Sequence, residues 1–166
     1  VDVLGFRARH LRHPLVGEIG CALAHRDAYK AIVNQNYCWT AIFEDDAEVL
    51  DINALMAELK TLCESLPTEA ATIVNLNYKA AQKPKCVRER YGPGLWRPVV
   101  PTYTTTAYLL NAHAASLLLQ RHSPVGAQAD WPIKSSEVLF LQTTKRLVRP
   151  EPAATSSVDP DLGRAK

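Results

Sequence analysis

The chain has 166 residues, of which 47% are hydrophobic and 22% are charged, so its size and composition are those of one globular domain. Its net charge of +2 is too small to indicate nucleic acid or an anionic membrane as the partner, and no apolar run reaches the roughly 18 residues of a membrane span. The cysteines contain no C-x-x-C pair, so we expect reduced thiols in a cytoplasmic protein: Cys21, Cys38, Cys63 and Cys86.

The first half of the chain predicts alternating helices and strands. From Gly17 to Asn36, apolar residues recur every three or four positions, which is the pattern of an amphipathic helix. The short apolar run from Trp39 to Phe43 is typical of a buried strand. Helical spacing returns from Ile52 to Leu66, where Pro67 stops it, and the β-branched run from Ala71 to Asn77 predicts another strand.

A long polar stretch with several Pro and Gly residues follows and predicts a surface loop. Basic side chains gather in or beside it, with two aromatic ones between them: Lys79, Lys83, Lys85, Arg88, Arg90 and Arg97, with Tyr91 and Trp96. Such a loop can close over a diphosphate or contact an anionic glycolipid, but most of its charges fit a solvated surface equally well. Trp96 stays a candidate contact for an acceptor sugar.

The second half returns to regular structure. Val99-Val100 and Thr104 to Leu110 indicate strands, and Asn111 is well placed to cap a helix that runs to about His122. The apolar segments 138–141 and 147–148 predict closing strands or helices, which the pattern does not distinguish. We therefore expect one α/β domain over residues 1–150 with a mostly parallel sheet, and an irregular tail over residues 151–166.

Three consecutive carboxylates, Glu44, Asp45 and Asp46, follow the strand that ends at Phe43. Like charges in adjacent positions repel and resist burial, so such a cluster is usually offset by a cation or exposed to solvent. Ligands of open α/β sheets bind at the carboxyl ends of strands, and Mg²⁺ or Mn²⁺ there typically bridges carboxylates to nucleotide phosphates. Two interpretations stay open: a metal-diphosphate site, or an acidic strand end in which Asp45, Asp46 or Asp51 caps the next helix.

Several motifs occur in an order that resembles glycosyltransferase family 25, which includes bacterial lipooligosaccharide galactosyltransferases and collagen galactosyltransferases. The segment Gly17-Glu18-Ile19-Gly20-Cys21-Ala22-Leu23-Ala24-His25 is similar to a helix start of that family, and Ile42-Phe43-Glu44-Asp45-Asp46-Ala47 to its strand ending in E-D-D. Thr106-Ala107-Tyr108-Leu109-Leu110 and Asp130 take the later positions, and Ser156-Ser157 matches a small-residue segment near the family's end. Four elements in order over most of the chain make the resemblance specific.

The resemblance implies a GT-A-like, Rossmann-like fold and a glycosyltransferase that moves a hexose, with galactose expected, from a UDP-sugar to a lipooligosaccharide or lipopolysaccharide acceptor. It also implies inversion at the anomeric carbon and dependence on Mn²⁺ or Mg²⁺. Glu44, Asp45 and Asp46 would form the donor site, with Asp46 and Glu44 as the metal ligands. Asp130 is the candidate base for the acceptor hydroxyl, although an Asp before Trp-Pro equally fits a helix N-cap. The protein would work in the cytoplasm, at the inner face of the membrane.

The chain departs from the family pattern at two places. Ala24 stands where the family usually has Ser, so His25 is expected to be a buried structural residue or an acceptor contact at least as readily as a catalytic one. The family's first strand and an Arg-containing turn would lie before Val1, so we expect an N-terminally truncated domain with impaired donor binding. Two other functions stay open: a remnant that binds metal or glycan without transfer, and a metal-dependent phosphohydrolase.

Overall fold

The computed structural model describes residues 1–2, 4, 7, 13–77, 88–98, 105–126, 129 and 136–151. In chain order its helices and strands are α2 (Val16–Gln35), β1 (Trp39–Phe43), β2 (Ala47–Val49), α3 (Ile52–Ser65), β3 (Thr72–Asn75), β4 (Arg88–Gly92), β5 (Leu95–Pro98), β6 (Ala107–Asn111), α4 (Ala112–Arg121), β7 (Leu139–Thr143) and β8 (Val148–Pro150). The predicted order of helix, strand, helix, strand is confirmed for the first half of the chain, and the closing apolar segments are strands.

The helices begin and end where local signals predict. At the start of α2, the Glu18 carboxylate accepts a hydrogen bond from the Leu15 N–H at 2.9 Å, and α2 ends at Asn36 in the left-handed region with φ 55°. The Asp51 carboxylate accepts from the Ala54 N–H at 3.0 Å and caps α3. This confirms the capping interpretation for Asp51.

Within the described residues, the central sheet has six strands in the order β1-β6-β3-β7-β5-β4. Only β3 and β7 pair in parallel, and the other four neighbouring pairs are antiparallel. The expectation of a mostly parallel sheet is therefore wrong. Alternating helices and strands predict crossover connections between parallel strands. They do not predict that β6 lies between β1 and β3 and is antiparallel to both.

Two predictions about single segments are also wrong. The run Trp39–Phe43 is a strand as expected, but it is an edge strand whose residues are half-buried or exposed. Part of the predicted surface loop instead forms the β4–β5 hairpin, which turns at Gly94 with φ +74°, a conformation that glycine adopts without strain. The expected strand at 99–100 and the basic residues Lys79, Lys83 and Lys85 lie outside the described residues.

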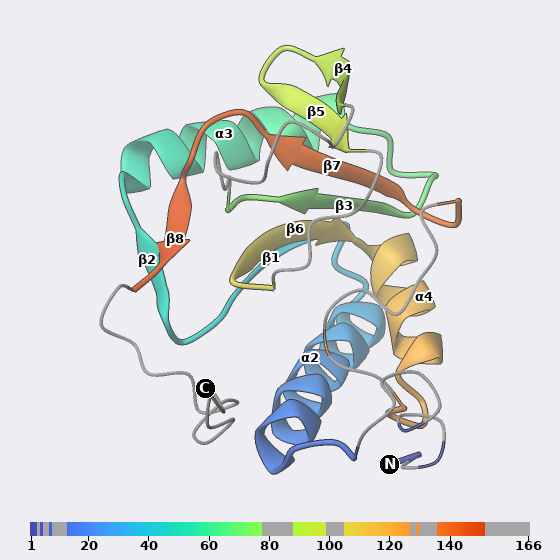
Figure 1. Ribbon diagram of the computed structural model, residues 1–166. Coiled ribbons are helices and arrows are strands. Elements are labelled where there is room, and N and C mark those ends of the chain that lie inside the picture. The colour runs from blue at the N-terminus through green and yellow to red at the C-terminus, as the bar shows by residue number, and fades with distance from the viewer. Residues whose placement is uncertain are drawn as a thin grey trace.

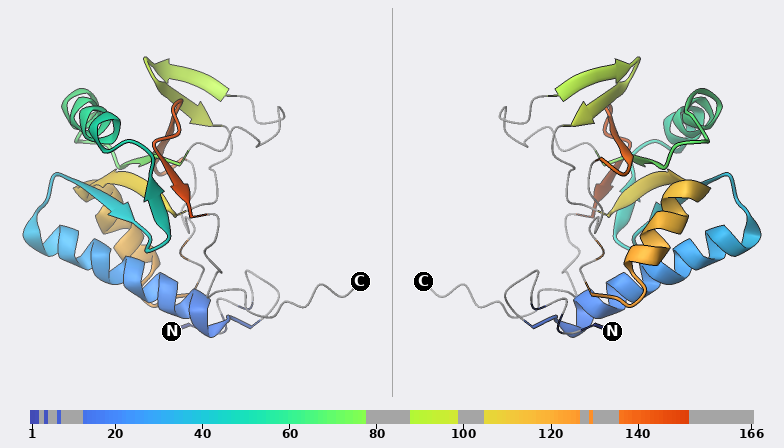
Figure 2. Two further views of the ribbon diagram at one scale, coloured as in Figure 1. Left: turned by 90° about the vertical axis from the view of Figure 1, so that its left-hand side faces the viewer. Right: turned by 90° about the vertical axis from the view of Figure 1, so that its right-hand side faces the viewer.

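Helices cover both faces of the sheet (Figure 1, Figure 2). On one face, α2 and α4 pack on the sheet through residues that include Tyr29, Leu118 and Ile73. On the other face, α3 packs through residues that include Leu62 and Val74. Ile73 and Val74 are adjacent in β3 and face opposite layers, as the alternation of side chains along a strand requires.

The strand directions bring the polar segments to one end of the sheet, the end at which several strands finish. Because β6 is antiparallel to both β1 and β3, and β7 is parallel to β3, the carboxyl ends of β1, β3 and β7 meet at the edge where β6 begins. The acidic segment 44–46 follows β1 at this edge and leads into β2, which pairs with β8 in a separate two-stranded sheet.

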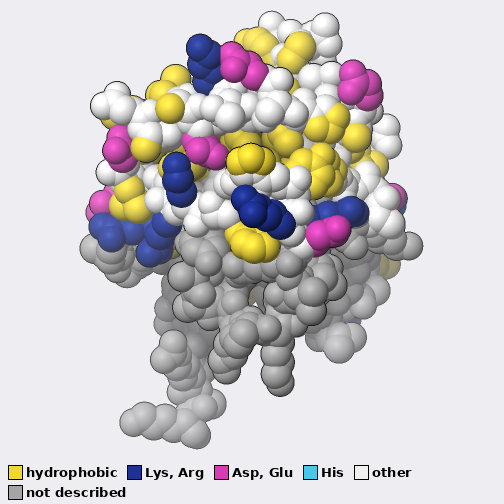
Figure 3. Space-filling view, turned by 90° about the horizontal axis from the view of Figure 1, so that it is seen from above, with side chains coloured by type: hydrophobic (Ala, Val, Ile, Leu, Met, Phe, Trp, Pro, Cys, Tyr) yellow, Lys and Arg dark blue, Asp and Glu magenta, His cyan; other side chains and the backbone are white. Residues whose placement is uncertain are grey.

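Charges of both signs share the described surface seen from above, with hydrophobic side chains between them (Figure 3). An ion pair joins β2 and β8, with 2.5 Å between the Arg149 Nε and a carboxylate oxygen of Glu48. The mixture agrees with the small net charge of +2. Within the described residues, the helices are too short or too polar to span a lipid bilayer.

Candidate functional site

The acidic segment forms a tight turn at the carboxyl end of β1. The Glu44 N–H donates to the Thr106 carbonyl at 2.9 Å, which extends the pairing of β1 with β6 by one residue. The Ala47 N–H then donates back to the Glu44 carbonyl at 3.1 Å, and the Glu151 N–H donates to the Asp46 carbonyl at 2.7 Å. These bonds hold the acidic turn between the two sheets, at the edge predicted from the sequence.

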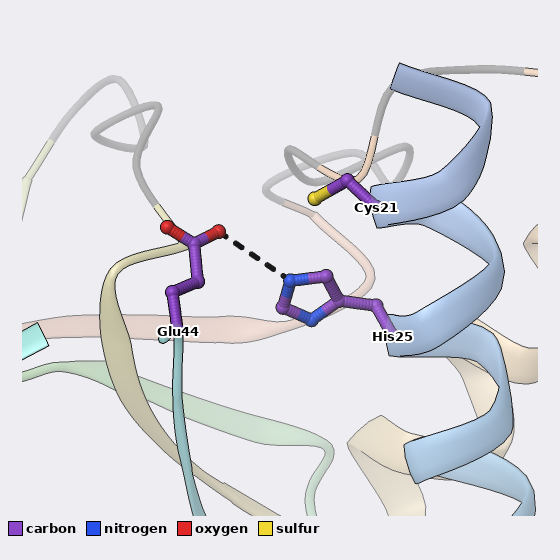
Figure 4. A group of neighbouring side chains, drawn as sticks. All are labelled: Cys21, His25 and Glu44. Atoms are coloured by element: carbon purple, nitrogen blue, oxygen red, sulfur yellow. Dashed lines mark ion pairs between the residues drawn. The ribbon is translucent and has the colours of Figure 1, made fainter. Parts of the chain in front are cut away.

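The Glu44 side chain points toward His25 of α2 (Figure 4). Its carboxylate accepts a hydrogen bond from the Thr105 hydroxyl and lies 3.5 Å from the Nε2 atom of His25. Burial raises the pKa of the Glu44 carboxyl, but the interaction with the nearby His25 ring and the hydrogen bond from Thr105 outweigh burial and hold that pKa below its ordinary value. Glu44 is therefore a carboxylate at neutral pH.

His25 belongs to a buried chain of hydrogen bonds. Its Nδ1 atom lies 2.7 Å from the Tyr108 hydroxyl, and the Tyr108 and Tyr29 hydroxyls lie 2.9 Å apart. The His25 and Tyr108 rings are stacked with centroids 5.7 Å apart. Burial, followed by the neighbouring Tyr29, raises the pKa of Tyr108 well above its ordinary value, so this hydroxyl stays neutral. The arrangement fixes the imidazole with Nε2 directed at Glu44.

Asp46 is the member of the turn with an unsatisfied atom. Its Oδ1 is buried and has no hydrogen-bond partner among the described residues. Burial raises the pKa of this carboxyl, and the negative charges of Glu44 and Asp45 raise it further. A buried, unpaired oxygen beside other carboxylates fits a divalent cation with oxygen ligands, because a cation supplies the missing partner and offsets the repulsion. Asp45 itself is exposed.

Two buried amides lie at the same end of the sheet, Gln142 on β7 and Asn77 two residues after β3, and the sequence motifs did not point to them. Asn77 and Gln142 are each 1% exposed, and neither side chain has a hydrogen-bond partner in the described part of the chain. Gln142 pairs with Asn75 in β3 and with Trp96 in β5. Asn75 in turn pairs with Tyr108 in β6, so these side chains share the face on which His25 lies.

The remaining predicted site residues are only partly placed. Trp96 lies in β5, half-buried beside Gln142, at the edge of the sheet that carries the candidate site. Asp130 and Ser156-Ser157 lie outside the described residues. A shallow hollow lies between α2 and α4, and residues such as Asn36, His113 and Leu117 line it. None of the candidate site residues lines this hollow.

The model of glycosyltransferase family 25 (LPS biosynthesis protein) matches residues 5–133, which is more than half of the chain. The chain belongs to glycosyltransferase family 25. The match includes the helix α2, the acidic turn and Tyr108, whereas Gln142 lies beyond it. A search of curated proteins returned no match.

Membership of glycosyltransferase family 25 supports a role in lipopolysaccharide biosynthesis and confirms the resemblance drawn from the motifs. Within this family 25 chain, the structure adds contacts that the motifs alone did not predict: Thr105 bonds Glu44, and Tyr108 bonds His25. One sequence signal pointed to a cluster around His25: Cys21 lies four residues before it, on the same face of the helix.

Proposed function

We propose that this chain transfers a hexose, with galactose expected, from a UDP-sugar to a lipooligosaccharide or lipopolysaccharide acceptor, with inversion and with Mn²⁺ or Mg²⁺ bound. The observation that carries the proposal is the buried, unpaired Asp46 oxygen in the acidic turn of a family 25 chain. Asp46 would hold the cation, with Asp45 beside it and Glu44 as a further contact to cation or ribose. When bound, the cation offsets the negative charge that the departing UDP gains.

The chain's own residues suggest how the donor is held. Asn77 and Gln142 present amides that can donate to and accept from the hydroxyls of a ribose or hexose. Trp96, beside Gln142, offers an aromatic face for a sugar ring. A base must also take the proton from the attacking acceptor hydroxyl on the face opposite the leaving group, and Asp130 is the candidate. Its position lies outside the described residues.

The decisive experiment is calorimetric titration of UDP into the whole chain with and without Mn²⁺. We expect binding that requires Mn²⁺ in the wild type and is weakened at least about tenfold in Asp46→Asn, since one lost charge contact is worth about 1.4 kcal/mol or more. Asp51→Asn is the matched control, because an Asn preserves the cap of α3 and the substitution removes the same charge nearby.

The outcomes separate the functions that the sequence left open. Metal-dependent UDP binding followed by transfer from UDP-galactose to a lipooligosaccharide acceptor supports the transferase. UDP binding that is as strong in Asp46→Asn as in Asp51→Asn contradicts the role of Asp46. Absence of binding in both metal conditions favours a remnant, and release of phosphate without an acceptor favours a phosphohydrolase.

A further inference from the structure

Cys21, His25 and Glu44 converge from two elements of the fold. Cys21 and His25 lie four residues apart on α2 and face the same side, and Glu44 follows β1. One ligand atom from each, the Cys21 Sγ, a His25 ring nitrogen and a Glu44 carboxylate oxygen, lie within 4.8 Å of one another. Figure 4 shows the three side chains directed into one common space.

The separation of His25 and Glu44 suits a shared metal better than a direct bond. Their Nε2 and carboxylate oxygen atoms are 3.5 Å apart. A charge-assisted hydrogen bond between such groups is shorter, about 2.7–2.9 Å. Two ligands that each lie about 2.0–2.2 Å from a tetrahedral ion stand roughly 3.3–3.5 Å apart, which is the observed separation.

Neighbouring hydroxyls orient two of the three ligands. Tyr108 bonds the Nδ1 atom of His25 and leaves Nε2 facing Glu44, and Thr105 bonds the Glu44 carboxylate. Contacts of this kind behind the ligands fix ring orientation and tautomer in metal sites. Since His25 is 5% exposed and Cys21 and Glu44 are half-buried, the site is shielded without being sealed.

We propose that Cys21, His25 and Glu44 bind a divalent cation of the zinc class, at a site that shares only Glu44 with the donor site and leaves the cation proposed there to Asp46 and Asp45. Sulfur and imidazole ligands select Zn²⁺ over Mg²⁺ or Mn²⁺, and three protein ligands leave a fourth position for water or another ligand. On binding, the Cys21 thiol releases its proton, and the thiolate and the Glu44 carboxylate together balance the two positive charges of the ion. The site does not depend on the proposed transferase activity.

The test uses Co²⁺, which takes the place of Zn²⁺ and reports a bound thiolate by a ligand-to-metal charge-transfer absorption. We titrate the whole chain with Co²⁺, and then displace it with Zn²⁺. We expect one equivalent to produce the absorption and Zn²⁺ to abolish it. Cys21→Ser should remove the absorption and weaken Zn²⁺ binding at least about 100-fold, since loss of a contact behind a ligand alone costs about 10–100-fold.

Three further variants keep the test specific. Cys38→Ser and Cys63→Ser make the same substitution outside the cluster and should retain the absorption. Tyr108→Phe keeps all three ligands but removes the hydroxyl behind His25, so it should weaken Zn²⁺ binding by about 10–100-fold while the absorption persists at saturation.

An absorption that survives in Cys21→Ser, or Zn²⁺ binding equal in Cys21→Ser and Cys38→Ser, would overturn the proposal. Far-ultraviolet circular dichroism establishes that each variant is folded, and a wild type that gives no absorption also overturns it. The result is separable from the test of the proposed function, which measures Mn²⁺-dependent UDP binding by the wild type and Asp46→Asn.

Discussion

The two ends of the central sheet both bury amide side chains, but they treat them in opposite ways. At one end, Asn111 is 1% exposed and its amide is fully used. The Asn111 side-chain oxygen accepts hydrogen bonds from the Thr72 N–H at 3.1 Å and from the Ala114 N–H at 3.0 Å. The Asn111 side-chain nitrogen donates to the Ala70 carbonyl at 2.6 Å and to the Thr68 carbonyl at 3.3 Å. The amide therefore joins β6, α4 and the start of β3.

At the other end, Asn77 and Gln142 are equally buried but have no hydrogen-bond partner within the described residues. A buried amide without a partner costs about 1–3 kcal/mol, so a fold gains nothing from it. The contrast separates the two roles: Asn111 stabilises the fold, whereas Asn77 and Gln142 are available to a ligand. The acidic turn, with its unpaired Asp46 oxygen, lies at the same end as the unused amides.

The largest effect is expected at the satisfied end. Asn111→Ala removes the cap of α4 and leaves buried N–H and carbonyl groups without partners. We expect the free energy of unfolding to fall by about 2–4 kcal/mol, measured by urea denaturation. Asn111→Ser keeps an oxygen that can accept at the helix cap without placing a charge against the Ala70 carbonyl, and is the matched control, with a smaller loss. Equal stability of Asn111→Ala and wild type would contradict the structural role.

The opposite pattern is expected for Gln142→Met, which keeps the length of the side chain and removes the unused amide. The free energy of unfolding should stay unchanged or rise by about 1 kcal/mol, because no internal hydrogen bond is lost. UDP-sugar binding in the presence of Mn²⁺ should weaken about tenfold, which calorimetry measures. A loss of stability comparable with that of Asn111→Ala would remove the distinction between the two ends.

Local signals in the sequence predicted the helix ends and the position of the acidic turn at both ends of the sheet. The caps at Asp51 and Asn111 and the end of α2 at Asn36 depend on residues within a few positions, so they could be predicted from the chain alone. The placement of Glu44 after β1 was equally local. The order of the strands could not be predicted locally, because β6 pairs with β1 and β3, which are distant from it in the sequence.

The candidate site was predicted less completely for the same reason. The E-D-D motif identified the acids, but the partners of Glu44 come from α2 and from the segment before β6. Asn77 and Gln142 carry no motif, and only the register of β3 and β7 brings them to one edge. A sequence pattern can name residue types for a site, whereas tertiary pairing decides which of them meet.

A pH series sharpens the comparison at the acidic turn. The pKa of Asp46 is raised above its ordinary 3.8, so the folded state binds more protons than the unfolded state in the window above that value. The Asp46 contribution therefore lowers the free energy of unfolding as pH rises from about 4 through the folded pKa. Asp46→Asn removes this decline, and we expect it to be more stable than wild type by on the order of 0.5 kcal/mol at neutral pH without metal.

The difference between the urea-unfolding curves of the two proteins isolates Asp46, because the remaining carboxylates are common to both. Glu44 contributes in the other direction: its pKa is lowered, so its contribution is present at neutral pH and is lost as pH falls. Added Mn²⁺ should stabilise the wild type and leave Asp46→Asn unchanged. A difference in the free energy of unfolding that does not change with pH would show that folding does not raise the pKa of Asp46.

The smallest effect is expected for a polar pair that is exposed rather than buried. Arg149 and Glu48 join β8 to β2 beside the acidic turn, and the guanidinium holds the pKa of the Glu48 carboxyl below its ordinary value. Since water screens exposed ion pairs, Arg149→Gln should change the free energy of unfolding less than any of the substitutions above, and less again at high salt. Urea denaturation at two salt concentrations measures this, with the exposed Arg90→Gln in β4 as the matched control outside the pair. A loss as large as that of Asn111→Ala would mean that this ion pair stabilises the fold as much as the satisfied amide at the opposite end does.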